Sequence, residues 1–160
     1  MNVTPERTLD SHRHYAADCS VRRALEALGP HSALLLLREA FYGTRRFDDF
    51  VERVGISEQV AAARLKGLVH EGLLEREPYQ DPGQRTRHAY RLTTKGKDLY
   101  VALVALMQWG DAYNAPPGGP SVLLTHRGCG AAVTAHVRCA EGHDLRPRDI
   151  AASPGPGAGG

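Results

Sequence analysis

Two cysteines and two histidines near the C-terminus have the types and the spacing of metal ligands. His126 is followed three residues later by Cys129, and Cys139 is followed four residues later by His143. Zinc prefers tetrahedral sets of nitrogen and sulfur ligands, and a site closed by four protein ligands is structural rather than catalytic. The spacing therefore permits a structural Zn²⁺ site, although a simple hairpin of two short strands explains the same segment without a metal.

A zinc enzyme requires more than these four side chains. A catalytic site keeps one metal position open and places a general base beside it, and Glu141 is the nearby carboxylate with suitable reach. No substrate pocket can be recognised in the sequence around Glu141. We therefore predict that the chain is not an enzyme, and no residue is predicted to be catalytic. His136, a fifth candidate ligand, points away from its neighbours if the segment alternates as a strand.

The composition is that of a globular protein with room for one ordinary domain and an appendage. The 160 residues are 42% hydrophobic and 24% charged, and the net charge is +2. No apolar run, residues 33–37 included, is long enough to cross a bilayer, and the N-terminus lacks the apolar stretch of a secretory signal. We expect a protein of the reducing cytoplasm without a membrane partner, so three cysteines do not indicate a disulfide framework.

The small net charge hides local clusters of charge. Acidic residues collect at 48–52 and 71–77, whereas basic residues concentrate at 22–23, 45–46, 64–66, 85–91 and 95–97. If the basic clusters share one face of the fold, that face is an anion-binding surface.

The central part of the chain predicts helices joined by short turns. Apolar residues recur at helical spacing over 19–28, over 31–43 and over 47–54, and a glycine follows or ends each segment. Ser57 can cap a further helix that runs to about Glu71. Two helices that are three residues apart, with a glycine at the turn, are typical of a helix-turn-helix.

Two short strands are predicted directly after the second of these helices. The segments LLEREPY (73–79) and RHAYRLT (87–93) flank a turn-rich basic loop. A helix-turn-helix followed by a hairpin is the order of a winged helix. Thr93 or Thr94 can cap one further helix, whose apolar stripe continues to Trp109 and suits a dimer interface.

The predicted fold class is α+β, mainly α. It consists of a winged helix-turn-helix with extra N- and C-terminal dimerisation helices and a small C-terminal β-hairpin extension. The predicted parts are a flexible arm over 1–17, the winged helix and dimerisation domain over 18–113, a linker over 114–121, the small β-rich extension over 122–150 and a disordered tail over 151–160.

Residues 19–110 resemble the HxlR family of bacterial winged-helix transcriptional regulators, which is related to the MarR group. The matching segments stand in family order and at family spacing; they are CSVRRALEALG (19–29), LLLLRE (34–39), RFDDF (46–50), GIS (55–57), RLKGL (64–68), EGLL (71–74) and YRLTTKG (90–96). The sequence departs from the family at 29–33, where a lysine-tryptophan pair is usual, and at Ala61, where a larger aliphatic residue is usual. The resemblance implies a homodimeric repressor or activator that binds double-stranded operator DNA.

The helix that begins at Ser57 is the candidate for the major groove, whose width admits one α-helix. Candidate DNA-binding residues of this helix are Ser57, Gln59, Ala62, Ala63, Arg64 and Lys66. Arg85, Arg87 and His88 flank the hairpin tip, and Arg45 and Arg46 precede the helix-turn-helix. These side chains are placed to contact phosphates or the minor groove. Any one of them is equally consistent with a solvated surface, and Arg64 could instead pair with an acid such as Glu52.

Two forms of regulation are compatible with the resemblance. A small-molecule effector would occupy a pocket between the dimer helices and the winged domain, lined by Leu34, Leu37, Phe41, Tyr100 and Trp109, although all five could equally be core. Alternatively, Cys19 lies at the start of a helix, a position that favours the reactive thiolate. In some family members the matching cysteine senses oxidants, whereas an inert buried cysteine is the plainer interpretation.

The C-terminal segment and the overall function leave alternatives open. Some relatives end in C-x-x-C-G, and CAEGH (139–143) lacks the second of these cysteines. The expected function is a dimeric transcriptional regulator, a repressor or a dual regulator, with an effector or a thiol switch. The alternatives are a metal-dependent enzyme that binds stoichiometric zinc and depends on Glu141, and a winged-helix module that binds proteins instead of DNA.

Overall fold

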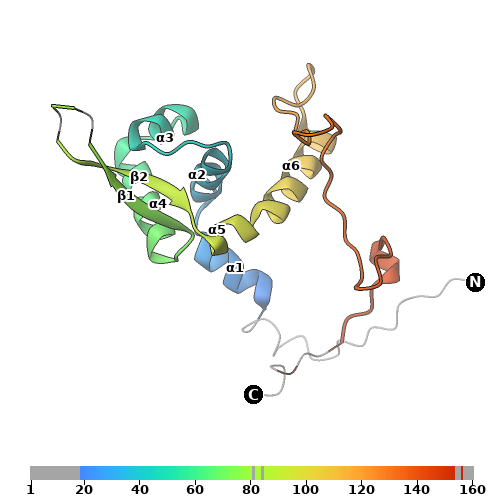
Figure 1. Cartoon of the computed structure of the whole chain (residues 1–160). Helices are drawn as coiled ribbons and strands as arrows, with labels where there is room; N and C mark the ends of the chain where they lie inside the picture. Colours follow the sequence, from blue (N-terminus) through green and yellow to red (C-terminus); the bar gives the residue numbers. More distant parts are fainter. Residues whose placement is uncertain (1–18, 81, 84, 154–155, 157–160) are drawn as a thin grey trace, which may run out of the picture. The chain divides into compact units, whose positions relative to one another are not determined.

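The computed structural model describes residues 19–80, 82–83, 85–153 and 156 (Figure 1). The predicted flexible arm and most of the predicted disordered tail lie outside these residues. The described chain falls into two compact units: one is Arg23–Leu103, and the other holds the described residues up to Arg22 together with those from Val104 onward. No helix in the described part of the chain is long and apolar enough to cross a membrane.

The order of the elements is that of a winged helix. The elements are α1 (Ser20–Leu28), α2 (His31–Phe41), α3 (Phe47–Val54), α4 (Glu58–His70), β1 (Leu74–Tyr79), β2 (Arg87–Leu92), α5 (Thr94–Asp98), α6 (Tyr100–Asn114) and a 3₁₀ helix η1 (Pro147–Asp149). The predicted helices that precede the hairpin and the predicted hairpin itself are therefore confirmed.

The turn between α3 and α4 is built by two capping residues. Gly55 takes the left-handed conformation, with φ of 69°, and its N–H donates to the Val51 carbonyl, which ends α3. The Ser57 hydroxyl then accepts a hydrogen bond of 3.3 Å from the Val60 N–H and begins α4. The sequence-predicted helix-turn-helix is thus built by a glycine C-cap and a serine N-cap.

A small antiparallel sheet follows α4. β1 and β2 pair from Leu74 opposite Leu92 to Tyr79 opposite Arg87. The residues before α3 add to the free edge of β2, because Arg46 forms an isolated bridge with Ala89 and the Tyr90 N–H donates to the Arg45 carbonyl at 2.8 Å. This edge contact fixes the start of α3 against the hairpin.

The core of the winged helix lies between α2, α3, α4 and the hairpin. Its fully buried side chains are Leu36, Leu37, Phe50, Leu65, Leu68 and Leu74. Phe50 meets the ring of Tyr90 edge to face, with the ring centroids 6.0 Å apart, a favourable aromatic geometry. One side of α4 therefore packs into the core, and the other side faces the solvent, where it can contact a partner.

Replacing two helical glycines by alanine should change the stability of the protein in opposite directions. A Cβ at Gly67, in the interior of α4, would meet nothing within 4 Å, whereas a Cβ at Gly96 would collide with the Leu73 carbonyl. We expect Gly67→Ala to raise the free energy of unfolding by up to about 1 kcal/mol, because glycine is a poor helix former. Gly96→Ala should lower it. Urea unfolding of both variants checks this, and a destabilised Gly67→Ala would contradict it.

The prediction of one continuous helix after the hairpin is wrong, because two helices, α5 and α6, meet at Leu99. Thr93 caps α5, and its hydroxyl also donates to the Gly72 carbonyl at 2.6 Å. Because Gly96 has no side chain, α5 can approach the Leu73 carbonyl at the base of the hairpin closely. The Leu99 N–H bonds three residues back, to Gly96, so the turn tightens there before α6 begins.

The predicted strands of the C-terminal extension are also wrong for the residues that the structure describes. In their place lie two isolated bridges, Thr125 with Ala132 and Arg138 with Asp144. Each bridge closes one short turn, so no ladder forms on which strands could propagate. The hydrogen bond from the Arg138 guanidinium lowers the pKa of the Asp144 carboxyl below its ordinary value.

Candidate nucleic-acid interface

The solvent face of α4 is composed of small and polar side chains. Ala61, Leu65 and Leu68 point into the core. The side chains of Ser57, Gln59, Ala62, Ala63 and Lys66 are exposed, as predicted. Because alanines lie among the polar side chains, another surface can approach the α4 backbone closely.

Arg64 lies apart from this exposed set. Its side chain is half-buried, and its Nε donates to the Ser32 hydroxyl of α2 at 3.3 Å. The predicted alternative, a pair with an acid such as Glu52, is therefore replaced by a bond to a hydroxyl. This bond ties the exposed helix to α2, so Arg64 also has a positioning role.

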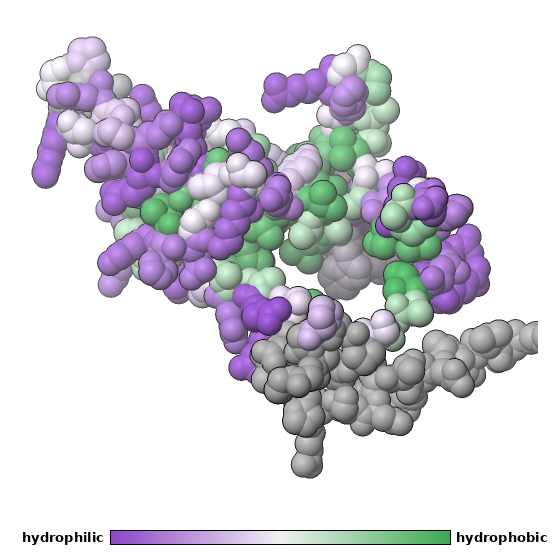
Figure 2. All heavy atoms as spheres, turned by 60° about the horizontal axis from the view of Figure 1, so that its bottom comes forward, coloured by the Kyte–Doolittle hydropathy of each residue, from purple (hydrophilic) through white to green (hydrophobic). Residues whose placement is uncertain are grey.

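The predicted basic residues of the hairpin are exposed. Arg85, Arg87 and His88 all lie on the surface, and the hairpin end at the left of Figure 2 is covered by hydrophilic side chains. The Arg87 guanidinium lies 3.2 Å from the Asp48 carboxylate at the start of α3. A surface ion pair of this kind contributes little stability, so Arg87 can exchange Asp48 for another anion.

A cleft lies between α4 and the hairpin. It is lined by Ala62 of α4, by Arg87 and His88 of β2, and by Arg76 and Tyr79 of β1. Three of the predicted DNA-binding residues, which come from α4 and β2, therefore line the same cleft. The cleft is also lined by residues that the sequence analysis did not identify as candidates.

Arg76 and Tyr79 are those missed residues. The Arg76 guanidinium lies 5.9 Å from the ring centroid of Tyr90, and that of Arg46 lies 4.9 Å from the ring of Tyr79. Cation–π contacts of this kind hold cations in place at a surface. The hairpin register gives a signal for Arg76, because Arg76 lies opposite Tyr90. The contact of Arg46 with Tyr79 depends on the chain before α3 and has no local signal.

The sequence of this helix-turn-helix matches a known protein family. A family model described as HxlR-like helix-turn-helix matches residues 27–117, which is more than half of the chain. The chain belongs to the HxlR family. The family resemblance of residues 19–110 is therefore confirmed, and the chain is a DNA-binding helix-turn-helix protein of transcription regulation.

Proteins similar to this HxlR-family chain are described as transcriptional regulators or transcription factors. The uncharacterized HTH-type transcriptional regulator Rv3095 of Mycobacterium tuberculosis is 44% identical over 139 residues, which are 86% of this chain and 87% of the relative. The crystal structure of PA1607, described as a candidate transcription factor, is 36% identical with a TM-score of 0.76 and covers 88% of this chain and 97% of its own. PA1374 of Pseudomonas aeruginosa, described likewise, is 35% identical with a TM-score of 0.60 and covers 87% and 94%.

The five residues predicted to bind an effector lie in different environments. Leu37 is fully buried in the core, and Leu34 is half-buried in the same helix. The rings of Phe41 and Tyr100 lie 5.2 Å apart, and Trp109 is exposed and contacts Tyr113. The structure therefore supports the core interpretation for Leu37.

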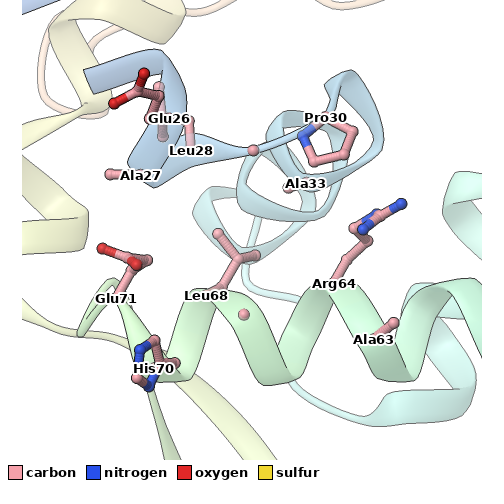
Figure 3. A pocket seen from close by; sticks show the side chains of 12 residues that line it. Glu26, Ala27, Leu28, Pro30, Ala33, Ala63, Arg64, Leu68, His70 and Glu71 are labelled. Atoms are coloured by element: carbon pink, nitrogen blue, oxygen red, sulfur yellow. The ribbon is translucent and has the colours of Figure 1, made fainter. Parts of the chain in front are cut away.

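A different cleft lies beside the helix-turn-helix (Figure 3). It has a volume of about 160 Å³ and is bounded by the end of α1, the start of α2 and one face of α4. Leu28, Ala33 and Leu68 form its apolar centre, with Arg64 toward one end and Glu71 toward the other. A molecule in this cleft would contact α4 directly.

The cysteines predicted to bind metal or to react with oxidants are free thiols. Cys19 is exposed directly before α1. His126 Nδ1 lies 3.2 Å from Cys129 Sγ, and His143 Nδ1 lies 3.3 Å from Cys139 Sγ. In the described part of the chain, no three His, Cys, Asp or Glu side chains come together as a metal site. Each half of the predicted ligand set is thus formed, but the two halves are separate.

Proposed function

We propose that this HxlR-family chain is a sequence-specific regulator of transcription that binds operator DNA as a homodimer, as a repressor or a dual regulator. The observation that carries the proposal is the solvent face of α4. Ala62 and Ala63 leave room for base edges in the major groove, while Ser57 and Gln59 supply hydrogen-bonding groups beside them.

The phosphate contacts come from the basic residues around this helix. Arg45 and Arg46 lie at the start of α3, and Arg85, Arg87 and His88 lie on the hairpin. These cations would fix the register of α4 on the duplex without reading sequence. We therefore expect operator affinity to fall steeply with salt concentration, because each neutralised phosphate releases counterions.

The homodimer is supported by exposed apolar side chains on two helices. On α6, Leu106, Trp109 and Tyr113 recur at helical spacing and are each more than half exposed. On α1, Val21 and Leu25 are exposed in the same way. An exposed apolar stripe that contains Trp and Tyr, as on α6, is typical of a protein–protein interface. A second copy of the chain, which carries the same stripe, is the partner that we propose.

Genome-wide footprinting of the full chain tests the proposed function. We expect discrete protected promoter sites that the purified protein also binds in vitro. The alternative function, a winged-helix module that binds proteins, predicts occupancy that does not change when the solvent face of α4 is altered. The bound promoters would also indicate the regulated pathway, and hence the small molecules to test in the cleft of Figure 3.

A thiol switch at Cys19 is the second form of regulation that we propose. Cys19 is free and exposed, so an oxidant can reach it. We expect peroxide to change operator affinity several-fold in the natural chain and to leave Cys19→Ser unaffected. Gel-shift titrations with and without peroxide measure this. Treatment of the oxidised natural chain with dithiothreitol is the control and should restore the original affinity, because sulfenic acids and disulfides are reducible. Equal responses of the natural chain and Cys19→Ser would end this proposal.

A further inference from the structure

The C-terminal segment after the linker folds without a core. From residue 105 to residue 153, the structure places no residue in a buried environment. Leu123 is 77% exposed and Val137 is 60% exposed. Folded segments of about 40 residues or fewer usually depend on disulfides, metals or association with another chain. Cys129 and Cys139 form no disulfide. We therefore expect a bound metal ion or a second chain to stabilise this segment.

The segment contains two turns of similar construction. In the first, Gly130 has a φ of 72° and donates to the His126 carbonyl at 2.8 Å. In the second, Gly142 has a φ of 82° and donates to the Cys139 carbonyl at 2.9 Å. Both glycines occupy the left-handed region that other residues avoid. Each turn is therefore a tight loop that holds one histidine and one cysteine side by side.

The spacing within each pair suits two ligands of one metal ion. With Zn–S near 2.3 Å and Zn–N near 2.0–2.1 Å, tetrahedral ligands lie about 3.5 Å apart. The observed Nδ1–Sγ distances of 3.2 and 3.3 Å are within a few tenths of an ångström of that value. Cys129 is exposed and Cys139 is only partly covered, whereas a cysteine that serves packing alone is usually buried.

We propose that the two pairs are complementary halves of a structural zinc site, and that His126 and Cys129 of one chain close it with Cys139 and His143 of a second copy. Each half supplies one nitrogen and one sulfur, and together they make the closed N₂S₂ set that structural zinc prefers. The proposal rests on the proposed homodimer, because neither half completes the site alone.

The two turns are held separately, and the extended chain between them favours a second copy over closure within one chain. The Gln108 side-chain amide donates to the Val133 carbonyl at 2.8 Å and accepts from the Ala135 N–H at 2.9 Å, which ties the first turn to α6. The second turn begins at Val137, whose carbonyl accepts from the Leu145 N–H. An extended run of chain separates the turns (Figure 1). Closure within one chain would require this extended run to fold back on itself, whereas pairing between copies leaves it as it is.

Subunit complementation tests this site directly. One variant carries His126→Ala and Cys129→Ser, and the other carries Cys139→Ser and His143→Ala. The two are co-expressed with different tags, and the doubly tagged heterodimer is purified. We expect one zinc ion per chain in the natural protein, none in either homodimeric variant, and one per two chains in the heterodimer. Metal analysis gives the stoichiometry, and cobalt substitution should show the sulfur-to-cobalt charge-transfer band of a two-thiolate site.

Two results would overturn the proposal: a natural chain without zinc, and a heterodimer that binds no more zinc than the single variants. Cys19→Ser is the control and should keep one zinc per chain. Footprinting of the same variants separates this proposal from the proposed function. DNA binding without zinc would refute the zinc site alone, whereas a natural chain that is monomeric and does not bind DNA would refute the proposed function.

Discussion

Ala62→Glu is expected to lower operator affinity at least about 100-fold, which corresponds to a loss of ~2.7 kcal/mol. The side chain of Ala62 is exposed on α4 and lines the cleft beside Arg87 and His88. If α4 lies in the major groove, a carboxylate at this position faces phosphates and the acceptor-rich edges of bases. The free energy of unfolding should change by less than about 0.5 kcal/mol, because the position is exposed and glutamate is a good helix former.

Ala62→Gln is the matched control, because it adds the same bulk without the charge. We expect it to weaken binding less than Ala62→Glu and to leave a measurable footprint. The comparison separates steric exclusion from electrostatic repulsion. Gel-shift titration at two salt concentrations, with circular dichroism to verify folding, measures both. If Ala62→Glu bound the operator like the natural chain, α4 would not be the element in the groove.

Trp109→Glu is expected to convert the dimer to monomers and to lose most operator binding. Trp109 is 58% exposed on α6 and its ring lies 5.5 Å from that of Tyr113. If a second copy covers this stripe, the new carboxylate is buried without a partner, which costs several kcal/mol. A loss of about 4 kcal/mol raises the dimer dissociation constant roughly 1,000-fold. A monomer can occupy one half-site, so the affinity from two linked half-sites is lost as well.

Trp109→Phe keeps an apolar ring at the same position and should remain dimeric. Sedimentation velocity at several protein concentrations distinguishes the two variants. Because the side chain is exposed within its own chain, the far-ultraviolet circular dichroism of both should match that of the natural protein. A dimeric Trp109→Glu would show that another surface joins the copies.

Local residue patterns were sufficient for the winged helix. Gly55 and Ser57 end one helix and begin the next by interactions that span three or four residues, so their effect can be predicted from spacing. The buried side of α4, with Leu65 and Leu68, follows from helical periodicity in the same way. The positions of α4 that periodicity does not assign to the core face the solvent. For this reason most predicted residues of the candidate interface are exposed.

Contacts between distant parts of the chain decided the rest. The sequence by itself determined the helix-turn-helix, the hairpin and the basic surface, because periodicity, caps and turns act over a few residues. Only the tertiary structure showed that Arg64 bonds to Ser32, 32 residues away, and that Arg46 lies over the ring of Tyr79. It also replaced the predicted C-terminal strands by two separate turns. Such contacts depend on how whole elements pack, and no local pattern specifies which distant side chain will be the neighbour.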